Sequence, residues 1–478
     1  MPLLRVVLIC WLVIFFLPVS AAPPGLPEGL VSPAPGLPEG LSPAPAAPSL
    51  PPGLSNPAPA ESTETEQSDS DENPTEFNGF VEYRYGRRVH DSVLHDETML
   101  NEARLHIELD KFGDEWNVEM AADALSDRVA TDNDVDLETG AGWLDLRKLN
   151  VRWQVAPSLD LRVGRQVITW GTGDLVFLND MFPKDYRYWM GRDIEYIKAP
   201  SDALRLSWYN DLMNVDLVYT PRFDSDRFLN GERLSLWNGI QGQLIGRNNP
   251  IPVDKPDAAF DDDEFALRLF RNFGSIETAL YGFDGFSKSP GGFDSTSGLF
   301  LFPRLRTFGA SLRAPLGPGI VNLEIAYWQA LDDKNGDNPL IDNGENRYLL
   351  GYEWEAWKNF TVGIQYYAEQ MRDYGDFLDN LPIGANPQPR LHEIWTLRLT
   401  RFMLSQTLKL SWFSYYTAEN GDWYARPEIH YQVNDRWAIE SGANGFGNRK
   451  NQTDAFLGQF EENSNVYIMI RYSFSGHR

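Results

Sequence analysis

The stretch Asn465-Val466-Tyr467-Ile468-Met469-Ile470-Arg471-Tyr472-Ser473-Phe474, close to the end of the chain, decides the fold. Residues with even numbers are mostly apolar, from Val466 to Phe474, whereas the residues between them include Arg471 and Ser473. Successive side chains of a strand point to opposite faces, so this period of two predicts a strand with one apolar and one more polar side. A strand of about ten residues that ends on an aromatic pair is typical of a membrane-spanning barrel.

The aromatic ending of this strand also resembles the C-terminal signal of bacterial outer-membrane barrels, in which an alternating last strand closes on Tyr-x-Phe. In that family the Phe is usually the last residue, whereas Ser475 to Arg478 follow it here. The resemblance implies the outer membrane of a Gram-negative bacterium. It also implies contact with lipid and lipopolysaccharide, and recognition of the last strand by the barrel-assembly machinery.

The composition of the 478-residue chain excludes several classes of protein. A net charge of -26 argues against a nucleic-acid partner, which requires a basic face. After the N-terminus there is no run of eighteen apolar residues, which excludes a helical membrane protein. The 15 Trp and 20 Tyr residues suit the two aromatic girdles of a membrane barrel, and the alternative is a Trp-rich carbohydrate-binding β-protein. Cys10 is the only cysteine, so thiol chemistry and disulfides are not expected.

The N-terminal part of the chain is predicted to lie outside the barrel. Residues 1–21 have the pattern of a signal peptide, with Arg5, an apolar run and small residues at the cleavage site. Residues 22–76 are first rich in Pro and then acidic, which predicts a disordered linker without a core. This arm is interpreted either as a tether to a periplasmic partner or as a plain solvated tail.

Residues 77–478 are predicted to form a closed, antiparallel, all-β transmembrane barrel of about 18 strands. The segment 143–155 changes phase between its halves, which indicates either a bulge or a register that differs from the one assumed. The expected strands are 78–86, 98–110, 114–125, 143–155, 157–170, 202–210, 212–221, 263–272, 274–284, 304–315, 318–331, 346–356, 358–371, 391–403, 405–417, 422–433, 435–446 and 464–474.

The connections between these strands alternate in length. Every second one is minimal and rich in turn residues, as at Phe273-Gly274 and Asn434-Asp435. The connections between them are longer, and the longest are 171–201 and 222–262. An outer-membrane barrel with periplasmic turns and extracellular loops requires this alternation, whereas a soluble sandwich does not.

Eighteen strands enclose a ring that is too wide for wall side chains to fill, so water or a loop must occupy the lumen. Charged residues of both signs are expected to face inward. They either create a transverse field that selects solutes or pair across neighbouring strands and stabilise the wall. The inward-facing candidates include Arg162, Arg165, Arg205, Arg268, Arg398, Glu353 and Glu355.

The third long loop, from Trp170 to beyond Tyr186, is too apolar to be solvated, so we expect it to fold into the lumen and narrow the channel, by analogy with general porins. A loop that caps one rim is the alternative. The polar residues predicted to line the constriction, opposite Arg162, Arg165 and Arg205, are Asn179, Asp180, Lys184, Asp185, Arg187 and Arg192.

The segment Leu161-Arg162-Val163-Gly164-Arg165-Gln166, followed by Trp170-Gly171, is similar to a Gly-Arg-Gln…Trp/Tyr-Gly segment of alginate-export-like and related porin-like barrels. The similarity covers about thirty residues. Membership would imply an eighteen-stranded channel with an Arg-lined lumen for an anionic polymer. The many inward carboxylates of this chain depart from that pattern and argue against a polyuronate substrate.

The chain contains no phosphate loop, nucleophile elbow, Cys-based metal site or His-x-x-x-His pair, so we expect neither an enzyme nor a cofactor. The sequence thus predicts an outer-membrane channel for passive diffusion of small hydrophilic solutes through a charged lumen. The alternatives are an export channel for an anionic polysaccharide and a non-conducting scaffold barrel around a partner protein.

Overall fold

The computed structural model describes residues 75–130, 134–189, 192, 194–247, 249–450 and 454–477. The predicted signal peptide and almost all of the predicted linker lie outside these residues. Among the described residues, no helix is both long and apolar enough to span a membrane.

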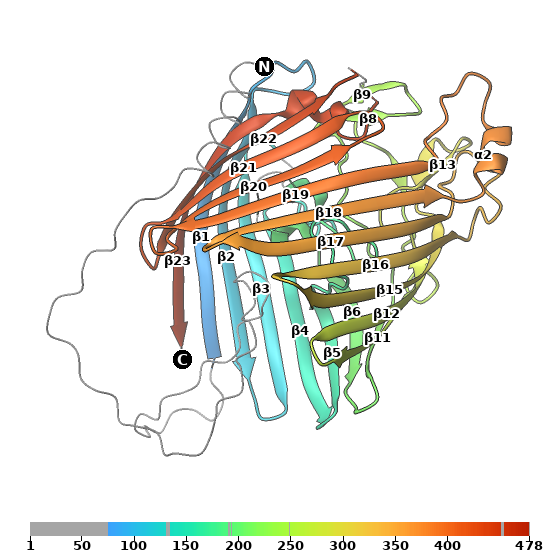
Figure 1. The fold of residues 1–478 in the computed structure, drawn as a ribbon. Helices are drawn as coiled ribbons and strands as arrows, with labels where there is room; N and C mark the ends of the chain where they lie inside the picture. Colours follow the sequence, from blue (N-terminus) through green and yellow to red (C-terminus); the bar gives the residue numbers. More distant parts are fainter. Residues whose placement is uncertain are drawn as a thin grey trace, which may run out of the picture. The chain divides into compact units, whose positions relative to one another are not determined.

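Eighteen antiparallel strands form one closed barrel (Figure 1). Each strand pairs with the next one along the wall, and β1 pairs with β23 from Glu76↔His477 to Arg88↔Asn465, which closes the ring. The predicted all-β barrel fold is confirmed. The wall strands are β1 (Thr75–Arg88), β2 (Thr98–Phe112), β3 (Trp116–Asp127), β4 (Leu144–Ala156), β5 (Leu159–Gln166), β6 (Ser201–Trp208), β7 (Asn214–Thr220), β11 (Glu264–Phe273), β12 (Ile276–Phe286), β15 (Arg304–Leu316), β16 (Gly319–Ala330), β17 (Glu345–Trp357), β18 (Phe360–Met371), β19 (Leu391–Met403), β20 (Leu408–Thr417), β21 (Asp422–Gln432), β22 (Trp437–Asn448) and β23 (Asn465–His477).

The long connections carry short elements of their own. These are the 3-10 helices η1 (Tyr186–Tyr188), η2 (Ile194–Ile197) and η3 (Gly458–Asn463), the helix α2 (Tyr374–Asn380), and the strands β8 (Leu236–Asn238), β9 (Gln243–Ile245), β10 (Val253–Asp254), β13 (Gly292–Asp294) and β14 (Leu299–Leu301).

The apolar faces of the wall strands point outward. Ile468 on β23 is 47% exposed, whereas Arg84 and Arg104 on the opposite faces of β1 and β2 are 1% exposed. A soluble barrel would bury the apolar side chains and expose the arginines, so this arrangement fits a wall surrounded by lipid. Further exposed apolar residues on the outer face are Val81, Val151, Val163, Leu204, Leu280, Phe308, Ile325, Leu350 and Trp395.

The connections alternate between short turns and long loops, as the sequence predicts. The turns on one side are 113–115, 157–158, 209–213, 274–275, 317–318, 358–359, 404–407 and 433–436. The loops on the other side are long, except 89–97 and 418–421. Loop 3 (167–200) joins β5 to β6, and loop 4 (221–263) joins β7 to β11.

The bulge predicted in the fourth strand is present. The β3–β4 register shifts between Ala121 and Ala122, opposite Arg147 and Lys148. As a result, both basic side chains lie on the lumen face. Arg147 donates to the carbonyl oxygen of Lys198 in loop 3 at 2.7 Å, and Lys148 lies 2.6 Å from the Glu108 carboxylate on β2.

The shortest strands of the wall are β5, β6 and β7, with 8, 8 and 7 residues. Loop 3 continues the hydrogen bonding beyond them. The Asp185 N–H donates to the Ile197 carbonyl oxygen at 2.6 Å, and the Arg227 N–H of loop 4 donates to the Lys184 carbonyl oxygen at 2.8 Å. The later part of loop 3, around residues 184–185 and 197, is therefore joined by strand-like pairing to itself and to loop 4.

Candidate functional site

A row of arginines lies on the lumen face of three neighbouring strands. Arg152 on β4 is the direct cross-strand partner of Arg162 on β5, which is the partner of Arg205 on β6. Their side chains are 48%, 26% and 27% exposed. Like charges directly opposite one another destabilise a sheet, so this row needs compensating carboxylates or a function that outweighs the cost.

Carboxylates on neighbouring strands compensate part of this charge. Arg268 on β11 extends the row, and four arginines then share three carboxylates. The pairs are Arg152–Asp160 at 2.6 Å, Arg162–Glu119 at 3.2 Å, Arg205–Asp216 at 3.0 Å and Arg268–Asp216 at 2.5 Å. The arginine row, defined as Arg152, Arg162, Arg205 and Arg268, therefore keeps an excess of one positive charge.

Two predicted lumen residues lie elsewhere. Arg165 shares the outer face of β5 with the exposed Val163 and forms a bidentate pair with Asp202, with Nη2–Oδ2 at 2.6 Å. The reason is the strict alternation of β5, which places Arg162 and Arg165 on opposite faces. Glu355 accepts a hydrogen bond from the Asn359 N–H at 2.7 Å in a short turn, so it lies at the rim of the barrel.

Loop 3 crosses the barrel. The N–H groups of Thr172 and Gly173 donate to the Glu324 carboxylate on β16, the second at 3.0 Å. The next residue, Asp174, forms a bidentate ion pair with Arg398 on β19, with Nη2–Oδ1 at 2.7 Å. Counted along the paired strands, β19 lies halfway round the ring from β5, where loop 3 starts.

The polar residues predicted for the constriction are mostly buried inside loop 3. Asn179 donates to Glu324 at 2.7 Å. Lys184 Nζ lies 3.1 Å from the Asp180 carboxylate. Asp185 binds Arg187 at 2.7 Å and also Arg227 of loop 4 at 3.1 Å. These contacts fix the shape of loop 3 and join it to loop 4 and to β16.

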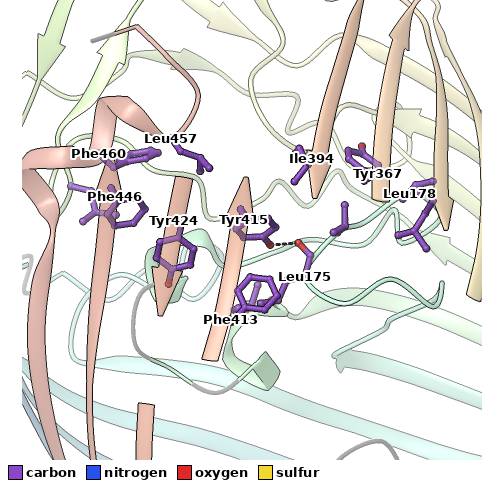
Figure 2. Packing of buried hydrophobic residues seen from close by; sticks show 14 of the residues in the cluster. Leu175, Leu178, Tyr367, Ile394, Phe413, Tyr415, Tyr424, Phe446, Leu457 and Phe460 are labelled. Carbon is purple, nitrogen blue, oxygen red and sulfur yellow. Dashed lines mark hydrogen bonds between the residues drawn. The ribbon is translucent and has the colours of Figure 1, made fainter. Parts of the chain in front are cut away.

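An apolar core fills part of the barrel where loop 3 meets the wall (Figure 2). Leu175 and Leu178 of the loop pack against inward-facing aromatic residues, and the Tyr415 hydroxyl donates to the Leu175 carbonyl oxygen at 2.5 Å. Trp189 contacts a set of aromatic rings on β20, β21, β22 and η3. Those rings are Tyr415, Tyr424, Phe446 and Phe460, with centroid distances of 6.3, 5.2, 5.9 and 5.8 Å.

Loop 3 also reaches the strands that close the barrel. Arg192 pairs with Glu82 on β1 at 2.9 Å and with Glu102 on β2. Arg471 on β23 reaches the same Glu82 carboxylate at 2.6 Å. Burial lowers the pKa of Arg192 to about 10, although Glu82 acts in the opposite direction, so this guanidinium stays charged at neutral pH.

Asp174, which binds Arg398, was not among the loop residues predicted from the sequence to line the constriction. It lies in the expected loop, next to small residues rather than among the charged residues that suggest a constriction. Glu353 and Arg398, two of the candidates for the lumen face, both lie opposite Gly363 in the wall. A Cβ built on Gly363, which separates the two residues, would lie 3.6 Å from the Glu353 carboxylate and 3.7 Å from the Arg398 side chain. Within the described ranges, no group of three or more His, Cys, Asp or Glu side chains could hold a metal ion.

The model of a family described as protein of unknown function (DUF1302) matches residues 56–410. The chain belongs to the DUF1302 family. No curated relative matches it.

Solved outer-membrane porins share the barrel fold. Acinetobacter baumannii OccAB4 has a TM-score of 0.50 and 11% identity over 85% of this chain and 99% of its own. Pseudomonas aeruginosa OccK5 (OpdH) has a TM-score of 0.49 and 11% identity over 84% of this chain and 98% of its own. At such identities the likeness to OccAB4 supports the fold alone.

Proposed function

We propose that this DUF1302 protein is a non-enzymatic channel in the outer membrane of a Gram-negative bacterium, through which small hydrophilic solutes diffuse passively. The arginine row carries this proposal. Its side chains are partly exposed on the lumen face of a closed barrel, where a purely structural wall would gain nothing from three arginines in direct register.

The constriction is proposed to lie between the arginine row and the part of loop 3 from Thr172 to Asp174. This differs from the region predicted from sequence, because Asn179, Asp180, Lys184 and Asp185 are at most 7% exposed and so do not reach a water-filled path. An excess of positive charge in a confined lumen raises the local concentration of anions. We therefore expect a preference for anions over cations.

The two alternatives each have one observation in their favour. The arginine row would suit export of an anionic polysaccharide, although Glu119, Asp160 and Asp216 lie beside it. The apolar core around loop 3 would suit a non-conducting barrel that holds a partner protein.

Planar-bilayer recording of the purified full chain tests the proposal. Discrete single-channel currents with a reversal potential that indicates anion preference are expected. Absence of conductance under all salt and voltage conditions would reject the channel and favour the scaffold barrel. Conductance combined with block by an anionic polysaccharide, such as alginate oligomers, but not by neutral dextrin would instead favour export.

A further inference from the structure

Three arginines lie on the outer side of the wall, at the end where the strands meet the long loops. Arg304 and Arg306 are among the first residues of β15, and Arg372 directly follows β18. Their side chains are 37%, 45% and 30% exposed. Leu305, between the first two, packs inside the barrel in one cluster with Trp170 of loop 3, so Arg304 and Arg306 point outward.

Strand pairing brings these guanidiniums close together. Arg306 is the cross-strand partner of Gln329 on β16, so Tyr327, two residues earlier, is its diagonal neighbour at about 7–8 Å. Arg372 Nη1 donates to the Tyr327 hydroxyl oxygen at 2.6 Å, and the Arg372 guanidinium lies 4.7 Å from the centre of that ring. Arg304, Arg306 and Arg372 therefore form one surface, which we call the rim patch.

The guanidiniums of the rim patch are only partly occupied by carboxylates. Arg306 Nε donates to Asp284 Oδ2 at 2.6 Å. Arg304 lies 3.9 Å from Asp284, and Arg372 lies 4.0 Å from Asp373, which are both too far for a hydrogen bond. Each guanidinium has five N–H donors, so the rim patch keeps donors that can bind a further anion.

Two other arginines at the loop end of the wall are arranged differently. Arg165 binds both carboxylate oxygens of Asp202, and its side chain is only 11% exposed. Arg87 at the end of β1 lies 2.5 Å from the Glu97 carboxylate. Each of these arginines is held by a carboxylate of its own, whereas in the rim patch Arg304 and Arg306 share Asp284.

An apolar surface adjoins the rim patch on the side of the short turns. Phe308 on β15 is the cross-strand partner of Tyr327. Phe308, Ile325 and Leu350 are 54%, 57% and 50% exposed on the outer face. In a membrane these side chains contact acyl chains, and the guanidiniums next to them lie at the level of the lipid headgroups. The surface thus fits a ligand with an anionic head and an apolar tail.

We infer that the rim patch binds a phosphate group of lipid A, the phosphorylated glucosamine lipid of the outer leaflet, and that its acyl chains lie against Phe308 and Ile325. This inference rests on the proposed outer-membrane location, in which the long loops face the cell exterior. A phosphate monoester carries a charge of about −1.5 to −2 and three acceptor oxygens, which suits several guanidiniums better than the single charge of a phosphodiester does.

Native mass spectrometry of the purified full chain in detergent, titrated with diphosphorylated lipid A, tests the inference. We expect the wild type to bind this lipid at least about tenfold more tightly than lipid A from which both phosphates have been removed. The combined changes Arg304→Gln, Arg306→Gln and Arg372→Gln should lower the affinity for diphosphorylated lipid A at least about tenfold. The comparison of the two lipids uses the unchanged protein, so it decides the inference even if the triple variant does not fold.

Arg87→Gln is the matched control, because it also removes an exposed guanidinium at the loop end of the wall. This variant should bind lipid A as the wild type does. Equal binding of the two forms of lipid A, or undiminished binding by a folded triple variant, would overturn the inference.

Two further probes separate lipid A from other phosphates. Phosphatidylglycerol that binds as tightly as lipid A would overturn the assignment to a glycolipid, and displacement of lipid A by an equal concentration of inorganic phosphate would overturn the assignment to a lipid. Lipid A binding by a barrel that never conducts would reject the channel and retain this site. Conductance without lipid A binding would reject only the site, so the two failures are distinguishable.

Discussion

At the scale of single residues, Glu324 on β16 shows how one inward carboxylate holds a loop across a barrel. It is 2% exposed and accepts hydrogen bonds from Thr172, Gly173 and Asn179 of loop 3. Leaving buried donors without an acceptor costs about 1–3 kcal/mol each. We therefore expect Glu324→Ala to lower the free energy of unfolding in urea by at least about 2 kcal/mol and to speed proteolysis within loop 3.

An exposed glutamate provides the control for this change. Glu97 pairs with Arg87, and their side chains are 67% and 59% exposed. Such surface pairs contribute about 0–1 kcal/mol, so Glu97→Ala should hardly change the urea midpoint. Equal losses in both variants would show that Glu324 has no special role in holding loop 3.

A second residue predicts how stability depends on pH. Asp226 of loop 4 is 6% exposed and accepts hydrogen bonds from the Lys184 N–H at 2.6 Å and from Ser289 at 2.7 Å. Burial raises its pKa, and Lys184 opposes this shift. The folded state thus favours the protonated form, and stability decreases as pH rises from the unfolded value of about 3.9 through the raised folded pKa. Asp226→Asn should remove this decrease.

Urea midpoints at several pH values between 4 and 8 check the prediction. We expect the wild-type midpoint to decrease with rising pH more steeply than that of Asp226→Asn, because the amide cannot ionise. Parallel curves for the two proteins would contradict it.

At the scale of elements, the strands were predictable because the lipid-facing side imposes a strict period of two. The predicted segment 391–403 matches β19, Leu391–Met403, at both ends. The segment 157–170 fails at its end, since β5 stops at Gln166. The apolar residues that follow look like more strand, but Ile168 and Trp170 pack with Met181 and Phe182 of their own loop. A sequence period does not reveal whether lipid or a loop buries an apolar side chain.

Gly164 allows a test at this scale. It lies in β5 with φ +117°, and an added Cβ would lie 2.4 Å from the Leu149 carbonyl oxygen on β4. Backbone cannot yield as a flexible side chain can, so Gly164→Ala should weaken the β4–β5 pairing by at least about 2 kcal/mol. The fraction of folded barrel, seen as heat-modifiable mobility in gels, should decrease.

Gly282 on β12 is the matched control, because a Cβ added there would meet nothing within 4 Å. Gly282→Ala should fold as well as the wild type. If the two variants fold equally well, the close approach of β4 and β5 does not limit folding.

At the scale of the whole barrel, the lumen contacts were beyond prediction from sequence. Loop 3 joins Glu324 and Arg398 on one side to Glu82 at the closing seam, where Arg471 of the last strand also binds. Each contact joins segments that are distant in the chain. The period of two predicts which side chains face inward, but it does not predict whether an inward charge meets water, another strand or a loop. For this reason the period of two could pair Arg162 with the neighbouring Arg205, whereas it could not show that Asp180 and Lys184 bind each other inside loop 3.

The arginine row gives the last prediction, which concerns the field of the whole lumen. In the wild type Arg162 lies 3.2 Å from the Glu119 carboxylate. Arg162→Gln removes this positive charge and leaves Glu119 as an uncompensated carboxylate. Because confined charges set the local ion concentrations, the ratio of anion to cation permeability should fall, on the order of twofold, in reversal-potential measurements at low salt.

The same charge is removed by Arg165→Gln, but on the outer face beside Val163, so this control should keep the wild-type ratio. Equal selectivity in all three proteins would mean that ions do not pass along the row, and that the arginines only stabilise the wall with their carboxylates.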